Sequence, residues 1–348
     1  MTVFNRYLLY RIKNSLLRTL IFTVLSILIT QTVLGDCIAW NKPEICNSGL
    51  YMFATMLGIF ASIIPFFELA GFKNRRNLDT LYFFPIKRES MALAHYVSGF
   101  VQVVFIYTVT YVSGFSFLAL NTDYFALHHM IPYYFLSLLL GLVIYSIFMF
   151  LFSRANSVAD GVLFCLLWIF LLSLVTSTLF DVIDVINNRD TVELNQSSVW
   201  GVGNQLSTWG IVYAPINNLT VLYQDLIEIN HPEEWNHQAH QIWEYAYMFF
   251  VWGAIGIAAA VGYFFSFAKA RAEKAGEISS SWFGYRILIP IYGYCLIYNM
   301  RSGGGANTLS LISVALMIIG YVVYRRGFKF KKSDIAVMAT GLLLAFVV

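Results

Sequence analysis

Three histidines between residues 231 and 244 have a spacing that suits metal binding. His237 and His240 stand three residues apart, which puts them on one face of a helix, and His231 lies upstream beside two glutamates. Zinc accepts imidazole and carboxylate ligands. The stretch has no H-E-x-x-H pattern, however, and histidines in a polar segment are commonly just solvated. We therefore predict no metal site in this chain. If a metal does bind, these three histidines are the candidate ligands.

Cys37 and Cys46 form a second pair with chemical potential. Eight residues separate them in a polar loop between two apolar runs. A loop on the outer face of a membrane meets an oxidising environment, so a disulfide and two free thiols are both open. Cys165 and Cys295 lie within apolar runs and are interpreted as small apolar side chains.

Four ionisable side chains stand out within the apolar runs, each near the end of its run: Glu68, His95, Asp160 and Arg286. Charges at membrane depth are costly and are therefore candidate functional groups. We expect structural pairing instead, for instance of Glu68 with Arg75 or Arg76. No run carries a charge at its centre, which argues against a proton-driven or ion-driven carrier.

The composition indicates the class of protein. Of the 348 residues, 59% belong to the set AVILMFWYC and only 12% are charged, whereas a soluble domain has roughly 25% charged residues. A soluble enzyme is nearly excluded, and so is a disordered chain, which contains few apolar residues. We predict an all-α fold, a polytopic membrane helix bundle.

Apolar runs close to the 20 residues that cross a bilayer recur along the chain. They predict eight or nine transmembrane helices, at 18–35, 50–71, 93–120, 131–153, 158–180, 245–268, 283–300, 307–324 and, less fully, 334–348. All basic residues except Lys42, Arg189 and Arg301 fall on one predicted side. The positive-inside rule makes that side cytoplasmic, which puts the amino terminus in the cytoplasm.

The longest polar stretch is the outer segment 181–244, between the fifth and sixth predicted spans. It is acidic, carries four tryptophans and contains amphipathic runs such as WGIVYAPINNLTVLY. Two interpretations stay open. The segment forms short helices that lie in the outer interface or close the exit of a pathway, or it is a compact cap with no role in transport.

The loop between the second and third spans has the most specific pattern. Leu78, Leu81 and Tyr82 recur at helical spacing, and Asp79 or Asn77 can cap the helix that they predict. Pro85 ends that helix because proline cannot donate the helical hydrogen bond. A short amphipathic helix flanked by basic residues suits a groove on a cytoplasmic partner. The alternative is a basic loop that only sets membrane orientation.

This loop resembles the coupling-helix region of type-2 ABC exporter permeases, the membrane subunits of bacterial ABC transporters, through Asp79-Thr80-Leu81, Pro85-Ile86 and Lys87-Arg88. The amphipathic start of the chain resembles the family's entry helix, with one side formed by Leu8, Leu9, Ile12, Leu16 and Leu17. The resemblance covers roughly residues 1–268. Two departures are Tyr82, where many members have Glu, and His95, where a Lys is common.

The resemblance implies an entry helix at 1–17 and a six-span permease core at 18–268. A third part at 269–348, with a linker and spans 7–9, exceeds the family's usual six spans. The core includes a coupling segment at 73–90 and the outer segment 181–244. The residues that would couple to an ATPase are Leu78, Asp79, Thr80, Leu81, Tyr82, Pro85, Ile86, Lys87 and Arg88.

The implied function is export of an amphipathic, lipid-like, peptide-like or drug-like substrate across the bacterial plasma membrane. The implied partners are a separate ATPase subunit that binds ATP and Mg, a second permease and membrane lipids; nucleic acid is not among them. This chain carries no G-x-x-x-x-G-K-[ST] motif, so we expect neither ATPase activity nor a cofactor in it. The alternatives are a membrane-embedded enzyme acting on lipid-linked substrates and an ion-coupled carrier.

Overall fold

Every element is helical in the part of the chain that the computed structural model describes, which is residues 3–39, 45–74, 86–121, 127–187, 212, 215–220, 235–270, 273, 275–277, 279, 281–302, 307–325, 327–328 and 330–347. Six described helices are long and apolar enough to cross a membrane: Val3–Asp36, Tyr51–Lys73, Arg88–Asn121, Met130–Ser153, Val158–Leu179 and Tyr247–Ala268. They coincide with the first six predicted spans. The chain is therefore a helical bundle of the multi-pass membrane class.

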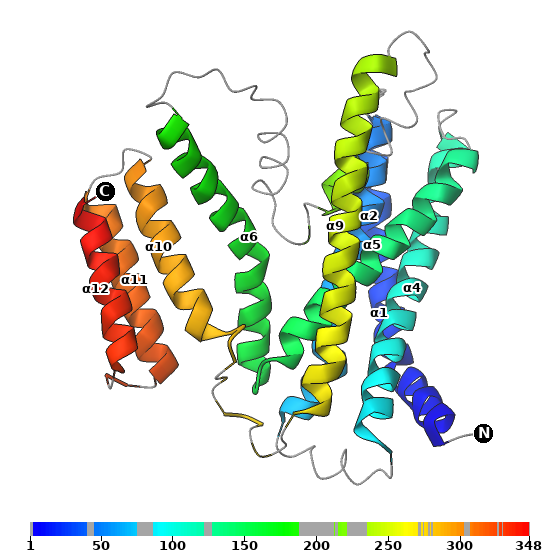
Figure 1. Cartoon of the computed structure of the whole chain (residues 1–348). Coiled ribbons are helices and arrows are strands. Elements are labelled where there is room, and N and C mark those ends of the chain that lie inside the picture. Colours follow the sequence, from blue (N-terminus) through cyan, green and yellow to red (C-terminus); the bar gives the residue numbers. More distant parts are fainter. Residues whose placement is uncertain are drawn as a thin grey trace. The chain divides into compact units, whose positions relative to one another are not determined.

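The helices divide into two compact units (Figure 1). Unit 1 comprises Met1–Ser153 and Val212–Gly276. Its main helices are α1 (Val3–Ala39), α2 (Ile45–Leu69), α4 (Arg88–Asn121), α5 (Leu127–Ser153) and α9 (Trp235–Ala268), and the short 3-10 helix η1 (Ala70–Lys73) follows α2. Unit 2 comprises Arg154–Ile211 and Glu277–Val348. It holds α6 (Val158–Asn187), α10 (Tyr285–Ser302), α11 (Asn307–Arg325) and α12 (Lys332–Val347).

Helix α6 packs against α10, and both helices lie in unit 2. The assignment of residues 18–268 to one six-span core stays a prediction. Asp160 in the first turn of α6 explains the contact with α10, because its carboxylate accepts hydrogen bonds from the Tyr285 hydroxyl at 2.7 Å and the Ser279 amide at 3.0 Å. A carboxylate satisfied in this way ties the start of α6 to the segment that leads into α10.

The first helix is polar on its buried side and apolar on its exposed side. A stripe of small hydroxyl residues is buried along α1: Ser15, Thr19, Thr23, Ser26 and Thr30. The exposed side carries Leu17, Leu20, Val24 and Leu28. This is the reverse of a soluble amphipathic helix, and it suits a helix whose outer face meets lipid.

Hydroxyl groups let α1 lie close along α4, which is its main packing partner. Thr19 and Thr23 return their hydrogen bonds to backbone carbonyls one turn earlier, at 2.9 and 2.8 Å. Thr110 of α4 reaches across and donates to the Ser26 hydroxyl at 2.9 Å. The hydroxyls of Thr19, Thr23 and Thr110 are therefore satisfied within the protein, as a membrane interior requires.

Residues 3–17, expected as a separate entry helix, are helical and run without a break into the first span. Helix α1 has 37 residues, which corresponds to about 55 Å at 1.5 Å per residue. The hydrocarbon core of a bilayer is only about 30 Å thick. Part of α1 therefore extends beyond the core if the helix crosses the membrane.

Helices α5 and α9 approach closely at Gly256. A Cβ atom added there would lie 2.8 Å from Cγ2 and 3.0 Å from Cα of Val143 on α5. Since the backbone of α5 is one of the obstacles, a rotamer change of Val143 cannot remove the clash. Gly253, one turn earlier on α9, has nothing within 4 Å of such an atom.

We predict that Gly256→Ala lowers the melting temperature of the purified chain in detergent, because overpacking costs about 1–3 kcal/mol. Gly253→Ala is the matched control. Both substitutions gain the same helix propensity, about 1 kcal/mol, but only the first meets α5. Equal melting temperatures for the two variants would contradict the close packing of α5 and α9.

Candidate functional site

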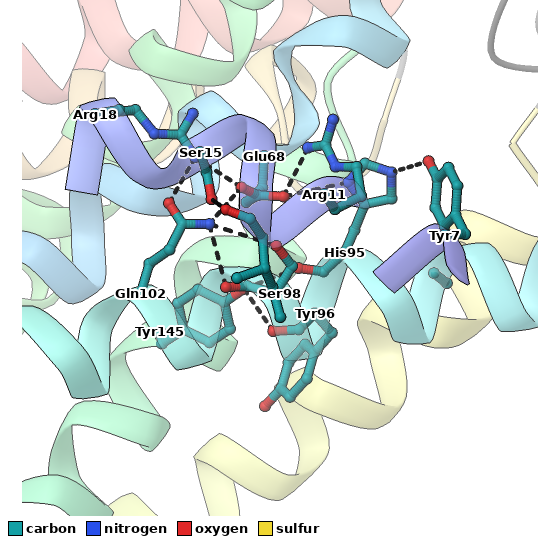
Figure 2. Close-up of polar contacts among 12 residues, drawn as sticks. Tyr7, Arg11, Ser15, Arg18, Glu68, His95, Tyr96, Ser98, Gln102 and Tyr145 are labelled. Carbon is teal, nitrogen blue, oxygen red and sulfur yellow. Dashed lines mark hydrogen bonds and ion pairs between the residues drawn. The ribbon is translucent and has the colours of Figure 1, made fainter. Parts of the chain in front are cut away.

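Glu68 is the centre of a buried ionic cluster that joins α1, α2 and α4 (Figure 2). Its side chain is 0% exposed and lies in the last turn of α2. The guanidinium of Arg11 donates from Nη2 to Oε2 at 2.7 Å, and that of Arg18 donates from Nη2 to Oε1 at 2.8 Å. Two cations from α1 thus meet one carboxylate from α2.

Gln102 of α4 completes the contacts around the carboxylate. Its Nε2 donates to Glu68 Oε1 at 2.8 Å, and its Oε1 accepts from Arg18 Nη2 at 2.6 Å. A side-chain amide has a donor and an acceptor at the same end, so it can serve both ionic partners at once. Gln102 therefore extends the ion pair between α1 and α2 to α4.

His95 connects the cluster to the start of α1. Its Nδ1 lies 3.4 Å from Glu68 Oε2, and its Nε2 lies 2.9 Å from the hydroxyl of Tyr7. The imidazole is only 1% exposed, and the ring of Phe72 packs edge-on against it at 4.7 Å. His95 is thus a buried bridge between Tyr7 and Glu68.

Helical spacing brings these side chains together. Arg11 and Arg18 are seven residues apart, which is two turns, so they share one face of α1. His95 and Gln102 have the same separation on α4. Gly99 between them lets α4 lie close to Glu68 of α2 and Tyr145 of α5. A Cβ atom at this position would lie 3.0 Å from Cγ of Glu68 and even closer to the hydroxyl of Tyr145.

Residues of the cluster stand on both sides of the segment 73–90, which we predict to be the coupling segment. Glu68 precedes this segment just before η1, and His95 follows it in the second turn of α4. Residues close to the two ends of this segment also contact α9 and the residues that directly follow it. The Phe72 ring lies 4.9 Å from that of Phe267, and Arg88 Nη1 donates to the carbonyl of Ala270 at 3.0 Å.

The arrangement is suited to holding helices together. Both carboxylate oxygens of Glu68 accept hydrogen bonds from side chains of other helices, and Glu68 itself is closed to solvent. Within the described ranges, no group of three or more His, Cys, Asp or Glu side chains comes together as a metal site. His231, His237 and His240 have side chains outside those ranges, so their assignment stays a prediction.

Most predicted coupling residues also lie outside the described residues: Leu78, Asp79, Thr80, Leu81, Tyr82 and Pro85. Ile86 is half-buried, Lys87 is exposed and α4 begins at Arg88. The side chains of Cys37 and Cys46 are not among those described, so both the disulfide and the free thiols stay open. Cys165 and Cys295 are buried free thiols, as their apolar surroundings predict.

The expected pairing of Glu68 with Arg75 or Arg76 stays a prediction, because both arginines lie outside the described residues. Among the described residues, Glu68 is paired with Arg11 and Arg18. Sequence reasoning assigned these two arginines only to membrane orientation. Their spacing of two helical turns was the available signal, because it places both on the face of α1 that also carries the hydroxyl stripe.

One piece of the outer segment lies within unit 1. Residues 215–220 are helical, and Ile216 and Thr220 are buried. The Tyr51 hydroxyl of α2 donates to Asn217 Oδ1 at 2.7 Å. A Cβ added to Gly58 of α2 would lie 2.7 Å from Ile216 Cδ1. Part of the outer segment is therefore packed against a predicted span.

We predict that Glu68→Ala strongly destabilises the chain, since removing one partner of a buried ion pair costs about 3–5 kcal/mol. The change leaves the guanidinium groups of Arg11 and Arg18 facing a cavity. Thermal unfolding in detergent measures the effect, and Glu89→Gln, at an exposed acid of α4, is the control. Similar melting temperatures for Glu68→Ala and the control would show that the cluster does not hold the helices.

The cluster also predicts a coupling energy that can be measured. In a double-mutant cycle of Arg18→Gln and Glu68→Gln, groups in direct contact show an interaction of about 0.5–3 kcal/mol. Additive changes in unfolding free energy would contradict the contact at 2.8 Å.

The function has to be argued from these residues, because relatives do not supply it. Comparisons of the chain with protein-family models, with curated proteins and with solved structures found no match.

Proposed function

We propose that the chain is the membrane-spanning permease subunit of an ATP-driven exporter of the type-2 ABC class. A separate ATPase subunit would bind ATP and Mg, and a second permease would complete the working unit. The substrate would be amphipathic, with lipid-like, peptide-like or drug-like character. The proposal rests on the loop pattern of residues 73–90 and on the buried cluster at the two ends of that loop.

The observation that carries the proposal is that one ionic cluster holds both ends of the segment 75–85. Glu68 stands before the segment and His95 after it, and both contact side chains of α1. A buried ion pair resists separation, because pulling it apart leaves uncompensated charges in a medium of low dielectric. A displacement of the loop by a bound ATPase would therefore shift α1, α2 and α4 together.

Contacts with α9 extend the same argument. Phe267 and Ala270 lie at the end of α9 and touch the two ends of the loop through Phe72 and Arg88. Motion at the loop would thus reach four helices of unit 1. The packing of residues 215–220 against α2 supports the interpretation that part of the outer segment closes the exit of a pathway among these helices.

The membrane arrangement follows from the same proposal. We propose that α10, α11 and α12 cross the bilayer as well, which gives eight or nine spans. The distribution of basic residues supports a cytoplasmic amino terminus and a cytoplasmic position for the segment 73–90. The bacterial plasma membrane is then the location of the complex.

Replacing Leu81 and Pro85 by alanine tests the coupling assignment. We expect the double variant to co-purify poorly with the ATPase encoded beside it, because an apolar anchor in a groove commonly contributes about 2 kcal/mol or more, which is roughly a 30-fold loss of affinity. Leu17→Ala is the control, since Leu17 is an exposed leucine on the apolar side of α1. Unchanged binding and unchanged ATP turnover in the double variant would make the coupling assignment wrong.

Glu68→Gln separates transmission from binding. The amide keeps the shape of the carboxylate but removes its charge, so the ATPase should still bind while substrate-stimulated ATP turnover falls. Turnover and binding that are both equal to wild type would exclude the cluster from transmission.

A further inference from the structure

One end of unit 2 carries a cationic and aromatic surface that lies outside the proposed coupling region. Helices α6, α10 and α12 begin at this end, and α11 finishes there. The ring of Tyr285 lies 5.6 Å from that of Tyr324, and the hydroxyl of Tyr285 contacts Asp160. Arg325 at the end of α11 forms an ion pair of 2.8 Å with Asp334 at the start of α12. These contacts bring the four helix ends together.

Large aromatic side chains are exposed at this end. Trp282 is 61% exposed and Phe328 is 82% exposed. They stand at the ends of apolar helices, where tryptophan and other amphipathic aromatic groups settle among lipid head groups. In water, such exposed aromatic groups at one end of a bundle would be costly.

Guanidinium groups stack on aromatic rings here. Arg286 lies 4.7 Å from the ring centroid of Trp282, and Arg154 lies 5.9 Å from that of Phe283. A stacked guanidinium keeps its N–H edge available for a phosphate. Arg154 already uses its Nε on the Ser281 hydroxyl at 3.2 Å. Arg286 is exposed and has no carboxylate partner among the residues that the structure describes.

Positive charge exceeds negative charge on this surface. Lys331 and Lys332 are exposed in the turn that leads into α12, close to Phe328. Asp160 accepts hydrogen bonds and Asp334 is paired with Arg325, and Glu277 is a further acid on the segment that leads into α10. Arg286, Lys331 and Lys332 therefore present charge that Asp160 and Asp334 do not neutralise.

We infer that this surface binds the phosphate groups of anionic phospholipids, with Arg286 and Trp282 as the first contact and Lys331, Lys332 and Phe328 as the second. Basic residues beside exposed aromatic rings match a leaflet that offers both phosphates and an apolar layer beneath them. The inference does not depend on the ATPase, so the two proposals can fail separately.

Tryptophan quenching by brominated lipid tests the inference on the full chain in uncharged detergent. Dibrominated phosphatidylglycerol is titrated, and the signal of Trp282 is isolated as the difference between each protein and its Trp282→Phe version. Arg286→Gln should weaken the apparent affinity about fivefold, the usual contribution of one basic residue near an anionic surface. Lys331→Gln combined with Lys332→Gln should weaken it further, and added salt should weaken binding by wild type.

Arg286→Lys and Lys13→Gln are the matched controls. The first keeps the charge and should lose less affinity than Arg286→Gln, and the second removes an exposed base of α1 and should leave the Trp282 signal unchanged. Equal quenching by dibrominated phosphatidylcholine would overturn the inference. So would unchanged affinity in both glutamine variants, or displacement of the lipid by inorganic phosphate at matched ionic strength. Helicity and gel filtration establish that each variant is folded before titration.

Discussion

A carboxylate buried between two guanidinium groups is the interaction on which unit 1 depends. Removing Glu68 from water is expensive, and the charges of Arg11 and Arg18, with the amide of Gln102, compensate for that cost. Each partner comes from a different helix than Glu68 does. The ionic requirement therefore fixes how α1, α2 and α4 sit against one another more sharply than apolar contacts can, because lipid offers apolar side chains an equally good environment.

The two units illustrate two ways of using polar groups at membrane depth. In unit 1, hydroxyls on α1 and α4 provide close approach, and the charged cluster provides specificity at one end. In unit 2, Asp160 ties the start of α6 to the segment that leads into α10, and Asp334 accepts from the amide of Lys331 at the start of α12 and pairs with Arg325 of α11. Both strategies keep charge near the ends of helices, where the cost of burial is lowest. The absence of charge from the span centres in the sequence follows from the same cost.

Much of the architecture could be predicted from composition and run length. The six long apolar helices coincide with predicted spans because hydropathy alone decides whether about 20 residues can cross a bilayer. The grouping of α6 with α10 could not be predicted, since it depends on a hydrogen bond between residues 125 apart in sequence. The same holds for Glu68, whose basic partners were expected in the adjacent loop. Spacing shows which side chains share a face, but it does not show which helix that face will meet.

The hydroxyl stripe of α1 also has a consequence for biogenesis. Thr110, which donates to Ser26, follows it by 84 residues, so at about 5–20 residues per second the ribosome delivers it roughly 4–17 seconds later. During that interval the first helix lacks its partner helix, and for the first part of it the helix also lacks Glu68, which follows Arg18 by 50 residues. A newly made α1 must therefore wait in a provisional environment, at the translocon or the membrane surface, before it can take its final place.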